Sequence, residues 1–113
     1  MKKTIEKFEI KEMSILNETG RCDEKNKPAL TNKQIKEMYE WMIITRAFDD
    51  KALKMQRQGR IGTYAPMRGQ EACQVGSVMA MQGDDWVFPA FRENGVYMMK
   101  GMPADKLFMY WAG

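Results

Sequence analysis

The sequence predicts a mainly helical chain with a short hairpin near its N-terminus and one short strand. Three observations support this fold class. Apolar residues recur at helical spacing over residues 32–58, and glycines and prolines divide the rest of the chain into short segments. The length of 113 residues suits a single modest core. Hydrophobic residues at 44% and charged residues at 29% are ordinary proportions, which argue against a disordered chain.

Residues 1–30 are predicted to form an arm, and residues 31–113 form the second part of the chain. The arm is rich in alternating lysines and glutamates, which favour solvent. A turn is expected over residues 17–20, preceded by a short strand that contains Met13, Ile15 and Leu16 and enters a hairpin. Lys27-Pro28 interrupts the chain before the next element.

A long helix is predicted over residues 32–58. Thr31 and Gln34 form a T-x-x-Q capping box, in which each side chain can bond to the backbone N–H of the other residue. Gly59 stands where a helix commonly ends in the left-handed conformation. The predicted apolar face comprises Ile35, Met38, Trp41, Met42, Thr45, Phe48, Ala52 and Met55.

A loop is expected at residues 59–69, followed by a helix over residues 70–82. Four glycine or proline residues exclude a regular element from the loop. The helix has Ala72, Gly76 and Ala80 at four-residue spacing, which would let another backbone approach closely. The sequence therefore predicts that this small-residue face is buried between other elements.

The remaining segments are a strand and two short helices. Trp86, Val87 and Phe88 are predicted to form a short buried strand, which Pro89 ends. A helix is expected over residues 92–100, and Pro103 suits the first turn of a last helix. The aromatic residues close to the final residue need further cover, so the sequence is expected to be a piece of a longer subunit.

Composition excludes several functional classes. The net charge of +3 is too small for broad nucleic-acid binding, and no apolar run approaches the ~18 residues of a membrane span. The N-terminus lacks the apolar region of a secretory signal, and its glutamates argue against a transit peptide, so a cytoplasmic location is expected. Histidine is absent. Cys22 and Cys73 lack metal-binding spacing and are expected to be reduced thiols.

Arginines in the two glycine-rich stretches suggest an anion site. Arg92 lies near the start of a predicted helix, where free N–H groups and the helix dipole favour a phosphate. The alternative is a surface ion pair, for example with Glu93. Arg60 and Arg68 have the same two interpretations. Tyr64 is expected either to line a ligand or to anchor its loop by a hydrogen bond to backbone.

Several motifs together carry a family resemblance. The stretches MYEWMIITRAFDDKALKMQRQGRIGTYAPMRGQEACQVGS, DDWVFPAFRENG and LFMYWAG occur in order between residues 31 and 113. They resemble the N-terminal portion of the alpha subunit of thiamine-diphosphate-dependent 2-oxo acid dehydrogenases, and most closely that of the pyruvate-specific members. The resemblance implies that this chain is part of an α/β thiamine-diphosphate-binding fold.

The resemblance also implies a reaction and its partners. The family oxidatively decarboxylates a 2-oxo acid with thiamine diphosphate and Mg²⁺, held between an alpha and a beta subunit in an alpha2-beta2 assembly. The acyl unit then passes to a lipoyl group on an acyltransferase component. The metal and diphosphate signature, a GDG followed by an asparagine, is expected outside these residues, and the activating glutamate belongs to the beta subunit. The 113 residues alone are therefore expected to be inactive and to associate through exposed apolar surface.

Four residues match positions of the family's site. Arg92 matches an arginine that contacts the diphosphate, and Phe91 matches a tyrosine whose hydroxyl helps to hold it. Thr63 and Tyr64 match a loop near the substrate pocket, where some relatives have phenylalanine at the position of Thr63. Pyruvate is the expected substrate, with branched-chain 2-oxo acids and acetoin left open. Two other functions stay open: a non-catalytic helical subunit-interaction module, and an anion-binding regulatory domain that uses Arg60, Arg68 and Arg92.

Overall fold

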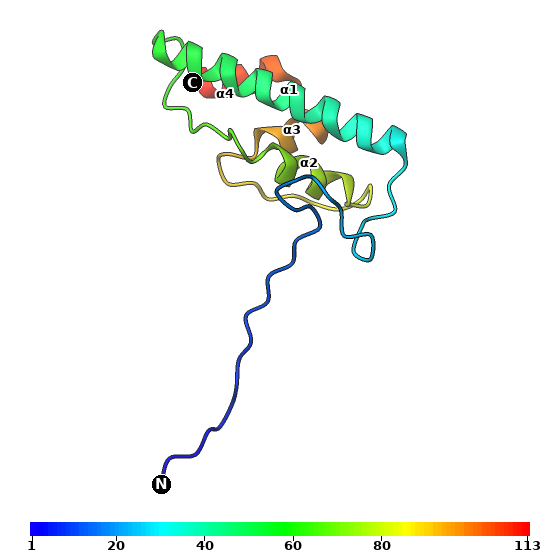
Figure 1. Cartoon of the computed structure of the whole chain (residues 1–113). Helices are drawn as coiled ribbons and strands as arrows, with labels where there is room; N and C mark the ends of the chain where they lie inside the picture. The colour runs from blue at the N-terminus through cyan, green and yellow to red at the C-terminus, as the bar shows by residue number, and fades with distance from the viewer. The chain divides into compact units, whose positions relative to one another are not determined.

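The structure, a computed structural model, describes all 113 residues and divides them into two compact units, Met1–Leu30 and Thr31–Gly113. The second unit contains four helices and no sheet (Figure 1). Their bounds are α1 Asn32–Arg57, α2 Glu71–Met79, α3 Asn94–Met99 and α4 Ala104–Ala112. None of them has the length and apolar content needed to cross a lipid bilayer.

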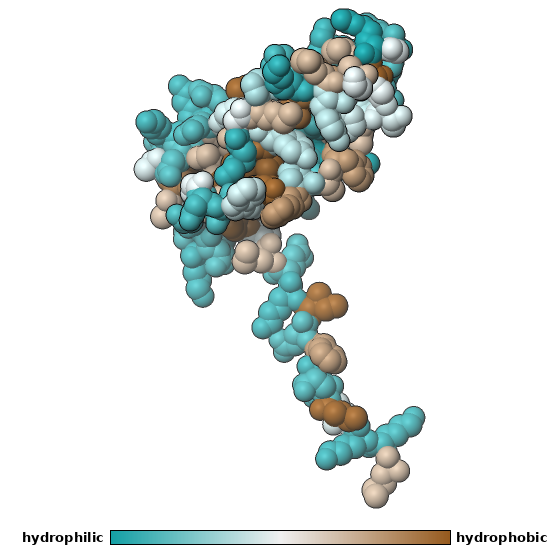
Figure 2. All heavy atoms as spheres, turned by 180° about the vertical axis from the view of Figure 1, so that it is seen from behind, coloured by the Kyte–Doolittle hydropathy of each residue, from teal (hydrophilic) through white to brown (hydrophobic).

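The first unit consists of an extended arm, a turn at residues 17–20 and a further segment that reaches Leu30. Asn17 organises this turn, because its Oδ1 accepts hydrogen bonds from the backbone N–H groups of Thr19 at 3.0 Å and Arg21 at 2.8 Å. The predicted hairpin strand is reduced to one antiparallel bridge between Leu16 and Cys22. Figure 2 shows the arm as mostly hydrophilic spheres with separate hydrophobic side chains among them, so no apolar cluster forms there.

The long helix α1 confirms the predicted capping box. The Gln34 N–H donates to Thr31 Oγ1 at 3.3 Å, and the Thr31 N–H donates to Gln34 Oε1 at 2.9 Å. The helix ends at Arg57, and Gly59 follows with a φ of +68°, as expected of a helix terminator. Helix α1 therefore begins and ends where its local sequence predicts.

The core of the second unit forms along one face of α1. Thr45, Phe48 and Ala52 are buried, whereas Ile35 at the start of the predicted face is exposed. The Phe48 ring stacks on Phe108 of α4 with 4.5 Å between centroids. The buried cluster also receives side chains from the loop, α3 and α4, namely Ile61, Tyr64, Met67, Met98 and Leu107.

Helix α2 is shorter than predicted and buries a different face. Glu71, Gln74 and Val75 are buried, whereas Ala72 and Ala80 are exposed. The prediction of a buried small-residue face was therefore wrong. The reason is hydrogen bonding: Glu71 pairs with Arg46 of α1 and Gln74 bonds to the start of α3, so the polar side chains face the protein.

The predicted strand at Trp86, Val87 and Phe88 is absent. Trp86 is 84% exposed and Phe88 is 88% exposed, with their rings stacked at 6.5 Å between centroids. A strand requires a neighbour for its backbone groups, and the unit offers none, while Pro89 has no N–H to donate. The segment is irregular, and α3 begins at Asn94 rather than at Arg92.

Three helices meet at Gly95, the second residue of α3. A Cβ atom at this position would lie 2.9 Å from Gln74 Oε1, 2.9 Å from Thr45 Cγ2 and 3.1 Å from Thr45 Oγ1. The Gly95 N–H donates to Gln74 Oε1 at 3.0 Å. The absence of a side chain therefore allows α1, α2 and α3 to approach one another here.

Candidate functional site

The side chain of Arg92 forms no ion pair. Its Nη1 donates to the carbonyl oxygen of Pro66 at 3.0 Å. The Glu93 carboxylate instead accepts the backbone N–H groups of Arg92 and Ala90 through Oε2, at 3.1 and 2.9 Å. The predicted alternative, a surface pair between Arg92 and Glu93, is therefore wrong. The guanidinium keeps donors that no carboxylate uses.

Phe91 lies directly beside this guanidinium. The Arg92 Cζ is 5.5 Å from the centroid of the Phe91 ring, within the range of a cation–π interaction. Phe91 is 56% exposed, so the ring covers one side of the arginine without being buried itself. Phe91 and Arg92 thus form a continuous surface of one aromatic ring and one cation.

The backbone near Arg92 is fixed by α2. Gln74 Nε2 donates to the Arg92 carbonyl oxygen at 3.0 Å, and Gln74 Oε1 accepts the Gly95 N–H at 3.0 Å. This N–H belongs to the first turn of α3, where free donors were predicted to face an anion. One of those donors is therefore already occupied by Gln74.

The loop that contains Thr63 and Tyr64 has two distinct sides. Tyr64 is buried, and its ring contacts Phe48 and Trp111 edge-on, at 6.4 and 5.1 Å between centroids. Thr63 is exposed. The two residues therefore differ in access to a ligand: Thr63 faces solvent, and Tyr64 anchors the loop in the core.

Asp49 is the partner of Tyr64, and sequence reasoning had missed it. The Tyr64 hydroxyl donates to Asp49 Oδ1 at 2.7 Å, so the predicted backbone partner for this hydroxyl is wrong. Burial, and then the hydrogen bond to Asp49, raise the pKa of Tyr64 above its usual 10.0. Asp49 Oδ1 also accepts the Met67 N–H at 2.8 Å. A signal existed in the sequence, because Asp49 follows Thr45 by four residues on the apolar face of α1.

Two further buried polar groups extend this network. Asn94 Nδ2 lies 3.5 Å from the Tyr64 hydroxyl oxygen, and Asn94 Oδ1 accepts the Trp111 Nε1–H at 3.2 Å. The Trp111 carbonyl oxygen accepts the Gly62 N–H at 2.8 Å. These bonds connect α1, the 59–69 loop, α3 and α4 around Tyr64.

A second acid–base contact joins α1 to α2. Arg46 Nε donates to Glu71 Oε1, and Glu71 Oε2 accepts the Gly69 N–H at 2.9 Å. The hydrogen bond from Arg46 lowers the pKa of Glu71 to about 2. Glu71 is in the first turn of α2, where the helix dipole also favours a carboxylate.

The two arginines of the 59–69 loop differ in their ion pairs. Arg68 Nη1 lies 3.7 Å from Asp50 Oδ1, which is the kind of ion pair expected for it, whereas Arg60 forms no ion pair.

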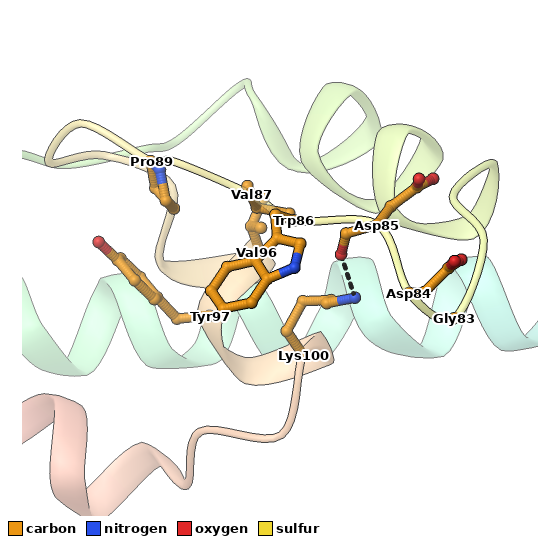
Figure 3. Close-up of a pocket in the computed structure, with 9 residues that line it drawn as sticks. All are labelled: Gly83, Asp84, Asp85, Trp86, Val87, Pro89, Val96, Tyr97 and Lys100. Carbon is orange, nitrogen blue, oxygen red and sulfur yellow. Dashed lines mark hydrogen bonds between the residues drawn. The ribbon is translucent and has the colours of Figure 1, made fainter.

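Two apolar pockets lie apart from the predicted site residues. One has a volume of about 470 Å³ and is lined by the 83–89 loop and by Val96, Tyr97 and Lys100. Figure 3 shows Lys100 reaching the Asp85 carbonyl oxygen, a hydrogen bond of 3.1 Å that ties this loop to the residue directly after α3. The other, of about 520 Å³, lies beside Arg46 and Glu71. Neither pocket is lined by Thr63, Tyr64, Phe91 or Arg92. No group of three or more possible metal ligands occurs in the chain.

Comparison with known families identifies the chain at family level. Residues 39–113 match the family described as dehydrogenase E1 component, which is well over half of the chain. The chain belongs to the dehydrogenase E1 component family. The Arg92 site, the 59–69 loop and the Asp49 network all lie within the matched residues, so they are features of an E1 region.

Three E1 relatives illustrate the similarity. The 3-methyl-2-oxobutanoate dehydrogenase subunit alpha of Mycobacterium tuberculosis is 40% identical over 84 residues, which are 74% of this chain and 23% of the relative. The pyruvate dehydrogenase E1 component subunit alpha of Acholeplasma laidlawii is 42% identical over 91 residues, 80% of this chain and 26% of the relative. The subunit of that name from Bacillus subtilis is 38% identical over 100 residues, which are 88% of this chain and 27% of the relative.

The chain spans about a quarter of the length of these E1 relatives. The predicted resemblance to an E1 alpha subunit is confirmed. The relatives named for pyruvate and for 3-methyl-2-oxobutanoate have similar identities to this chain, so identity alone does not distinguish the two substrates.

Proposed function

We propose that this chain forms part of the alpha subunit of a 2-oxo acid dehydrogenase that oxidatively decarboxylates pyruvate with thiamine diphosphate. The acetyl unit would pass to a lipoyl group on an acyltransferase component. The observation that carries this proposal is the guanidinium of Arg92, which forms no ion pair, in a chain that belongs to the E1 family. Its position supports contact with a diphosphate, because no carboxylate competes for it.

The residues around Arg92 fit a diphosphate group. An arginine has five N–H donors, and one Nη1 donor is used by the Pro66 carbonyl oxygen, which leaves others for phosphate oxygens. Phe91 supplies an aromatic surface but not the hydroxyl that tyrosine would offer. We therefore assign Arg92 the polar contact and Phe91 a packing contact. Thiamine diphosphate, when bound, stabilises the negative charge that develops on decarboxylation of the substrate.

The 59–69 loop is proposed to face the substrate through Thr63. Thr63 is exposed and small, so it leaves room beside the substrate, whereas Tyr64 is buried and supports the loop from behind. We propose pyruvate as the substrate because the GTYAPMRGQEA stretch resembles the pyruvate-specific members of the family. Branched-chain 2-oxo acids and acetoin are the competing substrates.

The proposed catalytic unit requires other protein chains and further residues. We assign the Mg²⁺ ligands to a GDG and a following asparagine outside these 113 residues, and the activating glutamate to a beta subunit. A second alpha subunit would complete the alpha2-beta2 assembly, for which a cytoplasmic location is proposed. The 113 residues alone are expected not to decarboxylate any 2-oxo acid.

The first test is the substitution Arg92→Ala in an assembled dehydrogenase that contains this chain. Loss of a charge-assisted bond to the diphosphate should weaken thiamine diphosphate binding by about 1.5 to 3 kcal/mol. Calorimetric titration with thiamine diphosphate measures this change. Arg68→Ala is the matched control, because Arg68 is an exposed arginine whose partner is Asp50. Equal cofactor affinity in the Arg92→Ala and parent proteins would contradict the proposed site.

A second test addresses the substrate at Thr63. Phenylalanine at this position should narrow the space beside the substrate. The substitution Thr63→Phe is therefore expected to reduce kcat/KM for 3-methyl-2-oxobutanoate more than kcat/KM for pyruvate. The ratio of the two kcat/KM values should change by about tenfold, the effect of one or two methylene groups of the substrate in an apolar pocket. Steady-state decarboxylation of both acids measures the ratio. An unchanged ratio of the two kcat/KM values would show that Thr63 does not line the substrate pocket.

A non-catalytic helical subunit-interaction module is the second candidate function. The observation that favours it is a series of exposed apolar side chains on α1, Ile35, Tyr39 and Ile43, at helical spacing. Such a module would co-purify with a dehydrogenase beta subunit. It would give no thiamine-diphosphate-dependent decarboxylation when every other subunit is supplied, and this result separates it from the enzymatic proposal.

A further inference from the structure

One peptide group connects Asp49 to Arg92. The Met67 N–H donates to Asp49 Oδ1 at 2.8 Å, and the Pro66 carbonyl oxygen accepts from Arg92 Nη1 at 3.0 Å. This N–H and this carbonyl belong to the same peptide unit, Pro66–Met67. The peptide is trans, as are all others in the chain, so its two polar groups point in opposite directions. The Asp49 carboxylate and the Arg92 guanidinium therefore bond to opposite edges of one rigid peptide group.

The two ends of this connection differ in burial. Asp49 is 1% exposed, and Met67 is fully buried. Arg92 is exposed. The carboxylate end is therefore fixed by packing within the core, whereas the arginine end faces solvent, where a ligand has access. A constraint at Asp49 passes outward to Arg92 through a planar group that cannot bend easily.

We propose that Asp49 is a positioning residue, which sets the orientation of the Arg92 guanidinium through the Pro66–Met67 peptide group. This inference rests on the proposed function, in which the oriented Arg92 guanidinium contacts the diphosphate. Asp49 is 1% exposed, so the role proposed for it is exerted through Arg92 and not by contact with a ligand.

Hydrogen bonding supports a role beyond simple geometry. A carboxylate that accepts the N–H of a peptide increases the acceptor strength of the carbonyl oxygen in that peptide, because linked hydrogen bonds polarise one another. The Pro66 oxygen is thereby a better acceptor for Arg92. Gln74 fixes the Arg92 carbonyl oxygen independently at 3.0 Å, so the backbone and the side chain of Arg92 are each held by a separate bond.

Four variants of the full 113-residue chain separate the possible roles of Asp49. Asp49→Ala removes both acceptor bonds, and Asp49→Asn keeps an amide oxygen in their place but removes the charge. Tyr64→Phe removes the hydroxyl bond and leaves the Met67 bond intact. Asp50→Ala is the matched control, because Asp50 is the next carboxylate of α1 and pairs only with Arg68, at 3.7 Å.

The first measurement follows Arg92 and Met67 by nuclear magnetic resonance in labelled chain. In Asp49→Ala the Met67 amide should exchange with solvent at least about tenfold faster, and the Arg92 Nε–H signal should move towards that of a free side chain. Asp49→Asn should give intermediate values, and Asp50→Ala and Tyr64→Phe should keep the parent Arg92 signal. If Asp49→Ala does not fold, the Asp49→Asn result decides whether Asp49 orients Arg92. An unchanged Arg92 signal in folded Asp49→Asn would overturn the proposal.

The second measurement is a double-substitution cycle in the assembled dehydrogenase, with thiamine diphosphate as the probe. Asp49→Asn should weaken cofactor binding about threefold, and Asp49→Ala about tenfold, in the parent background. Neither should weaken it further when Arg92 is already alanine, because a residue that acts through Arg92 has nothing left to orient. Equal losses in both backgrounds would show a general structural role and overturn the inference.

The two measurements distinguish this inference from the proposed function. If Arg92→Ala leaves cofactor affinity unchanged, the proposed contact with the diphosphate fails, and the magnetic resonance result still decides whether Asp49 orients Arg92. If Arg92→Ala weakens binding while Asp49 and Arg92 behave additively, the positioning role fails and the diphosphate contact stands.

Discussion

Three carboxylates around α1 have different surroundings, and these surroundings set their roles. Asp49 is buried and accepts hydrogen bonds from Tyr64 and Met67. Asp50, the next residue, is partly exposed and has only a distant ion pair with Arg68. Glu71 is buried against Arg46. A buried carboxylate fixes the groups that it bonds, whereas an exposed pair contributes little to stability.

Glu71 should make the stability of the chain depend on pH. Its pKa is lowered from 4.5 to about 2 in the folded chain, so the unfolded chain binds more protons between these values. Stability from this group is present in full above about pH 4.5 and is lost as pH falls towards 2. Glu71→Gln should lower the free energy of unfolding at pH 7 by about 1.5 to 3 kcal/mol and reduce this acid dependence.

Chemical denaturation of the parent chain and the Glu71→Gln variant between pH 2.5 and 7 measures both effects. Glu40→Gln is the control, because Glu40 is an exposed glutamate of α1 without an ion pair. If the two proteins lose stability equally on acidification, Glu71 does not carry the predicted dependence.

At the scale of elements, close packing at Gly95 holds three helices together. Thr45 of α1 and Gln74 of α2 are both buried and both contact the space where a Cβ would lie. Buried side chains cannot turn aside without disturbing their own neighbours. The spacing between α1, α2 and α3 therefore depends on a position without a side chain.

Two glycine substitutions should consequently have opposite effects. Gly95→Ala places a methyl group 2.9 Å from Gln74 Oε1 and should destabilise the chain by about 1 to 3 kcal/mol through overpacking. Gly76→Ala, inside α2, meets only Met38 Cε at 4.0 Å and should stabilise by about 0.5 to 1 kcal/mol. Urea unfolding of both variants measures these changes. Destabilisation by Gly76→Ala as large as that by Gly95→Ala would contradict the packing argument.

At the scale of the whole molecule, the core belongs to one of the two units. Every buried hydrophobic residue lies between residues 31 and 113, and none lies in Met1–Leu30. Large apolar side chains stay exposed on the 83–89 loop, notably Trp86 and Phe88. Such surfaces mark sites of association, as proposed here for a chain that forms part of a larger subunit.

A chain shortened to residues 31–113 should therefore keep its fold. Deletion of the first 30 residues removes no buried hydrophobic side chain and leaves the Thr31 capping box intact. The Tm should change by less than about 4 °C, which corresponds to about 1 kcal/mol for a domain of this size. Thermal melting followed by circular dichroism, at equal low concentrations, measures the change. Loss of a cooperative transition would show that the arm contributes to folding.

Local patterns in the sequence determined the ends of α1. The Thr31–Gln34 capping box and Gly59 set the ends of α1, because both act through bonds or dihedral angles within a few residues. The ordered motifs around Arg92 likewise indicated the family. These features need no knowledge of distant parts of the chain.

Only the tertiary structure decided which polar groups meet and which apolar groups are covered. Trp86 and Phe88 have a strand-like pattern, yet pairing requires a neighbouring strand that the chain lacks. Asp49, Tyr64 and the Pro66–Met67 peptide come together because α1 and the 59–69 loop fold against each other. Hydrogen bonds between distant residues depend on this packing. The sequence therefore indicates Arg92 as a candidate site residue, but it does not indicate the groups that orient the Arg92 side chain.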